Sequence, residues 1–192
     1  MQIKQENKSF GPRENPPKGT QCARLIHIID LGTQHTEFQG QAKDKRQVRL
    51  TWELVDSEMS DKRKFVVGKT YNASLYKSSL LDTIESMTGK PIEFHEDGSY
   101  NMGQLLDAPC MVTIDHVVKG DKTYANITSI SPMPTIKGKL VEADPSTNHI
   151  LNFGLDNFDQ DIYDMIPAWI QAIIEKSPEY KKIKGITQDI PF

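Results

Sequence analysis

Ten cationic and aromatic side chains fall in or beside polar stretches of this sequence, and their chemistry suits phosphates and bases. Single-stranded nucleic acids are bound by a cationic groove that follows the phosphates, together with aromatic faces on which bases stack. The candidates are Phe38, Lys43, Lys45, Arg46, Arg49, Lys69, Tyr71, Lys119, Lys122 and Tyr124. A single lysine in a loop is more often simply solvated, whereas Phe38 in a polar stretch is harder to explain without a ligand.

These side chains are predicted to act together on one surface. Five cations are expected to line one groove: Lys45, Arg46, Arg49, Lys69 and Lys122. Three aromatic side chains are expected to contact bases: Phe38, Tyr71 and Tyr124. Strand alternation directs Tyr124 outward, opposite Ile127, but places Trp52 in phase with Leu50, so Trp52 is predicted to be core and not a stacking surface.

Catalytic motifs are missing from the sequence. It holds no glycine-rich phosphate loop, no GxSxG, no CxxC and no HExxH, and its five histidines are dispersed. The acids Asp156, Asp159, Asp161 and Asp164 lack the glycine and closing glutamate of a calcium loop, so they are read as a solvated linker and a helix start. We therefore predict a protein that is not an enzyme and needs no cofactor or metal.

Composition points to one domain with attached segments. The 192 residues are 37% hydrophobic and 26% charged, which is somewhat polar for a compact globule. Cys22 and Cys110 are too few for a secreted disulfide scaffold, and neither a signal peptide nor a membrane-spanning apolar run is seen. A cytoplasmic protein without membrane contact is expected.

Charge is distributed unevenly along the chain. Residues 1–139 hold 19 basic and 17 acidic side chains, a net charge of +2, whereas residues 140–192 hold 4 and 9, a net charge of −5. This asymmetry favours a body that binds polyanions and a tail that does not, although a surplus of two charges also arises by chance. One role considered for the acidic part is to occupy the basic groove until DNA displaces it.

The order of predicted elements is typical of an OB-fold. Strands are expected at 22–32, 47–55 and 65–76, a helix at 77–90, and a hairpin of strands at 110–118 and 123–130. A five-stranded barrel with its helix between the third and fourth strands has this order, whereas a β-sandwich needs about seven strands. Along the second strand, Leu50 and Trp52 should face the core, and Arg49, Thr51 and Glu53 should face the other way.

Three regions are predicted from this reading: a flexible arm at 1–20, the OB-fold at 21–139, and an acidic linker, amphipathic helix and tail at 140–192. The helix carries one apolar stripe, formed by Ile166, Trp169, Ile170, Ile173 and Ile174. Apolar stripes are usually buried, so docking of this helix on the barrel is favoured over a free partner-binding helix.

The last four residues, Asp189, Ile190, Pro191 and Phe192, resemble the C-terminal tip of bacterial single-stranded DNA-binding proteins. The stretches VRLTWEL and KTYANITSISPMP are similar to phage-encoded single-stranded DNA-binding OB proteins. The resemblance implies a protein that coats and protects single-stranded DNA in replication or recombination. It also implies that these four residues dock replication or recombination proteins.

Two departures from the bacterial pattern matter. Gln188 stands where the bacterial tip has an acid, and Lys181, Lys182 and Lys184 make the local tail less acidic. The bacterial proteins form tetramers through the OB domain, so the resemblance leaves open whether this chain also forms a homo-oligomer. The alternatives are an OB-fold recombination or annealing factor, and a structural or adaptor protein that binds no nucleic acid.

Overall fold

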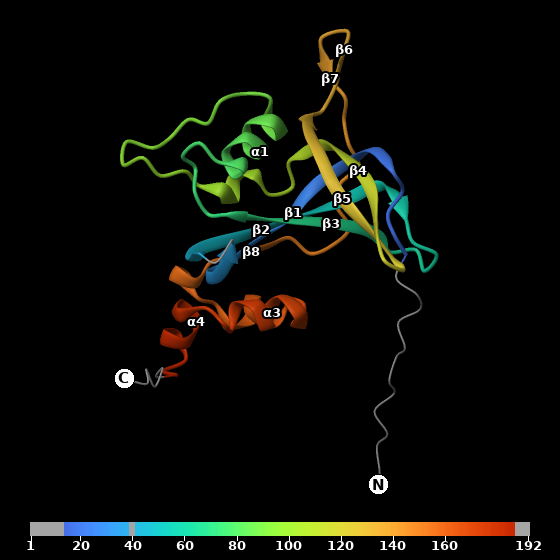
Figure 1. The fold of residues 1–192 in the computed structure, drawn as a ribbon. Helices are drawn as coiled ribbons and strands as arrows, with labels where there is room; N and C mark the ends of the chain where they lie inside the picture. Colours follow the sequence, from blue (N-terminus) through green and yellow to red (C-terminus); the bar gives the residue numbers. More distant parts are fainter. Residues whose placement is uncertain (1–13, 39–40, 187–192) are drawn as a thin grey trace.

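The protein is mainly β, with small helices on both sides of its sheet (Figure 1). The computed structural model describes residues 14–38 and 41–186, and the side chain of Phe38 is outside that description. Five long strands run in the order β3-β2-β1-β4-β5, each antiparallel to its neighbour, and a short sixth strand, β8, pairs parallel to β1. Their bounds are β1 Gly19–Phe38, β2 Gln41–Glu58, β3 Lys64–Asn72, β4 Pro109–Lys119, β5 Lys122–Pro132 and β8 Leu151–Phe153.

The sheet remains open within the described residues. There, β3 pairs only with β2 and β5 only with β4, so no ladder joins the two edges. A separate hairpin, β6 Thr135–Ile136 with β7 Lys139–Leu140, follows β5. In the part of the chain that is described, no helix is long and apolar enough to cross a membrane.

The first two strands form a much longer hairpin than the sequence predicts. The polar stretch 33–46, which lies between the two predicted strands, extends both of them and is paired from Thr33 with Arg46 out to Phe38 with Gln41. Cross-strand polar contacts support this ladder: His35 Nδ1 lies 2.8 Å from Asp44 Oδ1, and Thr36 Oγ1 donates to the Lys43 carbonyl at 2.9 Å. Polar side chains do not prevent pairing when the backbone ladder continues from two well-buried strands.

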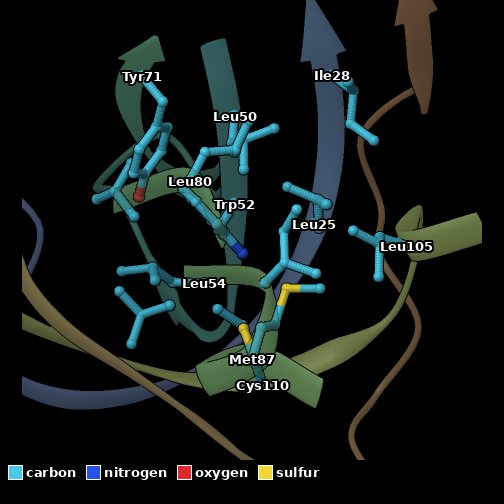
Figure 2. Close-up of a cluster of buried hydrophobic side chains, with 14 of the residues drawn as sticks. Leu25, Ile28, Leu50, Trp52, Leu54, Tyr71, Leu80, Met87, Leu105 and Cys110 are labelled. Carbon is cyan, nitrogen blue, oxygen red and sulfur yellow. The ribbon is translucent and has the colours of Figure 1, made fainter. Parts of the chain in front are cut away.

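One face of the sheet packs against α1, Ser79–Thr88, as predicted. The Ser78 hydroxyl accepts from the Leu81 amide at 3.2 Å and caps the helix start, and Gly89, with φ of 72°, ends it in the left-handed region. The side chains of Leu80, Ile84 and Met87 are buried against the second strand's predicted core face: Val48, Leu50, Trp52 and Leu54 (Figure 2). A 3-10 turn at Met102–Leu105 adds Leu105 to this cluster.

The opposite face of β2 is also buried, which corrects the expectation of a half-buried strand. Thr51 is 6% exposed and Glu53 is fully buried. Residues 141–159, which we call the C-terminal strap, cover this face. The Glu53 carboxylate accepts four hydrogen bonds from the strap, from the amide and hydroxyl of Thr147 at 2.8 and 3.2 Å and from the amide and side chain of Asn148 at 2.8 and 2.6 Å.

Polar side chains of β1 hold the rest of the strap. Arg24 donates to the carbonyls of Ala143 and Asp144 at 2.8 and 2.6 Å. His27 Nε2 lies 3.1 Å from the His149 carbonyl, and burial lowers the pKa of His27, so the neutral ring donates to that oxygen. The strap is therefore a hydrogen-bonded part of the fold and includes β8 and the 3-10 turn Leu155–Asn157.

Three short helices follow the strap: α2 Gln160–Asp164, α3 Ala168–Ile174 and α4 Pro178–Ile183. Pro167 and Pro178 stand at the boundaries of α3 and α4 and divide the helical stretch. Ile170 and Ile174 pack with Ile29 of β1 in a second buried cluster, so docking of the predicted amphipathic helix is confirmed. In Figure 1, α3 and α4 lie on the side of the sheet opposite α1.

We predict that Glu53→Gln lowers the free energy of unfolding by about 3 kcal/mol. An amide keeps one acceptor oxygen but turns two donors toward the strap, and each hydrogen bond to a charged group contributes about 1.5–3 kcal/mol. Urea unfolding measures the loss, and limited proteolysis should cut the strap faster. The exposed Glu93→Gln is the matched control and should change neither quantity. Unchanged strap protection in Glu53→Gln would contradict this role of the carboxylate.

Candidate nucleic-acid interface

Three of the predicted cations share one face of the β1–β2 hairpin. Lys43, Lys45 and Arg49 are separated by even numbers of residues on β2. The register shift between Lys45 and Arg49 adds a residue, Leu31, to β1 and none to β2, so the three side chains leave the same face of β2. Lys43 and Lys45 are exposed. Arg49 pairs across the ladder with Ile29, which packs against α3, so this is the face that the C-terminal helices partly cover.

The hairpin separates its charges between its two faces. Lys43 lies opposite Thr36 and Lys45 opposite Gln34, which gives one face two cations and two uncharged polar residues. The other face carries the pairs Glu37 with Ala42, and His35 with Asp44. This end of the hairpin therefore presents a cationic face without a carboxylate of its own, which we call the cationic face.

Arg49 is held between β3 and α3. Its guanidinium carbon lies 4.8 Å from the ring centre of Trp169, and Nη1 donates to the Thr70 hydroxyl at 3.3 Å. Gly68 permits this placement, because a Cβ there would lie 2.5 Å from Nη2 of Arg49. The β2–β3 ladder has no register shift at Gly68, so this glycine serves the close approach of Arg49 and is not part of a β-bulge.

Arg46 belongs to the opposite face, which corrects its place in the predicted groove. Nη2 of Arg46 lies 2.5 Å from Asp30 and 2.8 Å from Asp156, so two carboxylates balance its charge. The hydrogen bond to Asp30, above all, raises the pKa of Arg46. The ion pair with Asp30 borders a largely apolar cavity of about 260 Å³ that is lined in part by Leu80 and Phe153. Arg46 therefore joins the hairpin to the strap.

Tyr71 is a core residue, which corrects its predicted role as a base contact. It is 3% exposed, and its hydroxyl accepts a hydrogen bond from the Thr83 hydroxyl of α1 at 3.2 Å. Figure 2 shows the ring in the same cluster as Leu50 and Leu80, and burial raises the pKa of the phenol. Lys69 is exposed, with its Nζ 5.3 Å from the Tyr71 ring centre, and it is on the core side of β3, not beside Arg49.

Lys119, Lys122 and Tyr124 surround the β4–β5 turn, as predicted, but they form a separate site. Tyr124 is 43% exposed, which confirms that it faces outward. The β1–β4 ladder ends where Gly19 pairs with Ile114, so this turn extends beyond the first residue of β1, whereas Arg49 pairs with Ile29, well along that strand. The structure does not place Lys122 in one groove with Arg49.

Part of the predicted N-terminal arm lies along the β4–β5 hairpin. Asn15 donates to the Thr123 carbonyl at 3.1 Å, and Lys18 pairs with Asp115 at 2.7 Å. Residues 1–13 lie outside the described residues, as does the predicted docking tip, Asp189, Ile190, Pro191 and Phe192. Phe38 is described only through its backbone, which pairs with Gln41 at the far end of the β1–β2 hairpin.

The sequence prediction missed Trp169 as a surface residue. Its position on the apolar stripe indicated burial, yet Trp169 is 55% exposed. The buried residues of the predicted stripe are Ile166, Ile170 and Ile174, which are spaced four residues apart. Trp169 lies beside this buried row and is exposed. A stricter helical spacing would have separated the tryptophan from the buried isoleucines.

Comparison with known proteins gave no match: no family model fits the chain, and no curated protein is similar to it in sequence. Within residues 14–38 and 41–186, no cluster of three histidine, cysteine or carboxylate side chains could hold a metal ion.

We predict that replacements of Tyr71 act on stability and not on a ligand. Tyr71→Ala should lower the free energy of unfolding by about 3–5 kcal/mol, as expected for a large aromatic residue in a core. Tyr71→Phe loses only the hydrogen bond from Thr83, about 1 kcal/mol. Urea unfolding distinguishes the two, and Tyr76→Ala, at a tyrosine that is 77% exposed, is the control. A tenfold loss of nucleic-acid affinity in a stable Tyr71→Phe variant would contradict a purely structural role.

Proposed function

We propose that this protein binds single-stranded DNA and is not an enzyme. The observation that carries the proposal is the cationic face of the β1–β2 hairpin, where Lys43 and Lys45 are exposed and Arg49 follows in the same row. Cations repeated every second residue along a strand can follow a phosphate backbone without reading its sequence. The exposed Tyr124, between Lys122 and the rest of β5, offers a second contact for a strand.

The element order supports an OB-type barrel as the scaffold. Three strands precede α1 and a two-stranded hairpin follows it, which is the order of that fold. The sheet order β3-β2-β1-β4-β5 leaves β3 and β5 as the two edges, the pair that an OB barrel brings together. In such folds the second and third strands and the adjoining loops bind oligonucleotides, and Arg49 and Thr70 belong to those strands.

In the cell, the proposed role is to coat and protect single strands during replication or recombination. Binding through phosphates and base faces is sequence-tolerant, as such a role requires. The proposed site of action is the cytoplasm, or the host cytoplasm for a phage gene. The motif of Asp189, Ile190, Pro191 and Phe192 supports recruitment of replication or recombination proteins through its resemblance to bacterial tips.

Titration of labelled oligo-dT, duplex DNA and RNA at several salt concentrations tests the proposal. Oligo-dT should bind tightest, and its affinity should fall with salt. In the double variant Lys43→Glu, Lys45→Glu, the slope of log affinity against log salt should fall by about 1.4, roughly 0.7 for each lost phosphate contact. Both side chains are exposed, so the fold should persist.

The matched control is Lys90→Glu, at an exposed lysine just after α1, which should bind as the unaltered chain does. Equal affinity for duplex and oligo-dT would favour a different nucleic-acid role. Absence of binding to every oligonucleotide would remove the proposal in favour of an adaptor protein. An unchanged salt slope in the double variant would show that the binding site does not include Lys43 and Lys45 of the cationic face.

For the docking motif, we predict that deletion of 189–192 abolishes capture by proteins that bind the tips of bacterial single-stranded DNA-binding proteins. An apolar side chain that fills a pocket and a proline that limits backbone freedom favour docking of an extended peptide. Pull-down measures capture, and Gln188→Ala, just before the motif, is the control. Oligo-dT affinity should stay equal or rise slightly. Retained capture after the deletion would contradict the docking role.

A further inference from the structure

We propose that Trp169 on α3 is a base-stacking platform, so that the C-terminal helices form part of the DNA-binding surface. The inference rests on the proposed function, because it names a base contact for the same cationic face. Trp169 is 55% exposed, and the guanidinium of Arg49 lies 4.8 Å from its ring centre. Arg49 therefore lies over one face of the indole, while more than half of the Trp169 surface is open to solvent.

Packing does not account for a tryptophan at this position. The second buried cluster is formed by Ile166, Ile170, Ile174 and their partners on β1 and β8, and Trp169 is not one of its members. An indole that is held in place yet open to solvent therefore points to a ligand with a flat apolar face.

The surroundings of the indole favour a nucleotide over an apolar partner. Arg49 continues the row of Lys43 and Lys45 on β2, so the platform lies at one end of a line of cations. At the other end of α3, the side chain of Gln34, which lies opposite Lys45, donates to the Ile173 carbonyl at 3.1 Å. Thus α3 extends beside the cationic face from Arg49 toward Lys45, and a strand whose phosphates follow these cations can place a base on Trp169.

Arg49 has two functions in this arrangement. Its stacking on the indole fixes the ring orientation before a ligand arrives, which reduces the entropy lost on binding. Its charge also attracts the phosphate next to the stacked base. Gly68 and Thr70 hold the guanidinium against β3, so the platform is built by residues from β2, β3 and α3 together.

Tryptophan fluorescence tests the platform directly, because the chain has two tryptophans and Trp52 is fully buried. Saturation of the full chain with oligo-dT should quench the emission of Trp169 and protect it from iodide. The difference between the full chain and Trp169→Phe assigns the signal. Anisotropy of labelled oligo-dT measures affinity independently.

Trp169→Ala should weaken oligo-dT binding by about fivefold to a hundredfold, which is the usual effect of removing one base–aromatic stack. Trp169→Phe should restore part of the affinity, because phenylalanine retains an aromatic face. Met165→Ala, at another half-exposed apolar residue close to α3, is the matched control and should bind normally. Urea unfolding of each variant shows whether the helices remain docked.

The outcomes separate this inference from the proposed function. Tight oligo-dT binding with unquenched Trp169 emission and unchanged affinity in Trp169→Ala would overturn the platform while the proposed function stands. Absence of oligo-dT binding by the full chain would overturn both. Quenching together with a selective loss of affinity in Trp169→Ala, but not in Met165→Ala, would establish the platform.

Discussion

The buried carboxylate of Glu53 is the constraint on which the arrangement of the C-terminal half depends. A carboxylate without exposed surface in the middle of a sheet is costly unless donors replace its water, and the amides and side chains of Thr147 and Asn148 supply four. Those donors fix the strap across the back of β2. Once residues 147 and 148 are held there, the next residues can reach β1 and pair with it as β8.

A row of polar side chains on β1 also binds the strap, in addition to Glu53 of β2. Arg24, His27 and Asp30 bind the strap at successive points, through the carbonyls of Ala143 and His149 and the amide of Leu155. Without the strap, His27 would lose the His149 carbonyl, and Arg24 and Asp30 would each lose a partner, although Arg24 still binds Asp107 and Asp30 still binds Arg46. Polar groups that lose partners at partly buried positions are costly. Two apolar layers result: one between the sheet and α1, and one between β1 and the C-terminal helices.

Local signals in the sequence predicted the elements that depend on near neighbours. The helix at 77–90, the alternation of Leu50 and Trp52 and the hairpin of strands at 110–118 and 123–130 were all recognisable, because each is decided within a few residues. The burial of Thr51 and Glu53 was not, since the strap residues that bind Glu53, Thr147 and Asn148, are nearly a hundred residues away in the sequence. Alternation alone cannot distinguish a polar face that meets water from one that meets another segment of the chain.

The misplacement of Arg46 has a different and local cause, because β2 begins at Gln41 and alternation therefore extends past the predicted strand start at residue 47. Arg46 and Arg49 are three residues apart and chemically identical, yet alternation sends them to opposite faces, where Arg46 meets Asp30 and Asp156 while Arg49 meets Trp169. One acid of the C-terminal half, Asp156, does reach a residue of the predicted groove, and that residue is Arg46. Among the described residues, Lys43 and Lys45 have no ion-pair partner within 4.0 Å. Asp156 of the strap therefore pairs with Arg46, and the cationic face remains open. The arginine that stabilises the fold and the lysines that are available to a polyanion thus lie on opposite faces of the hairpin.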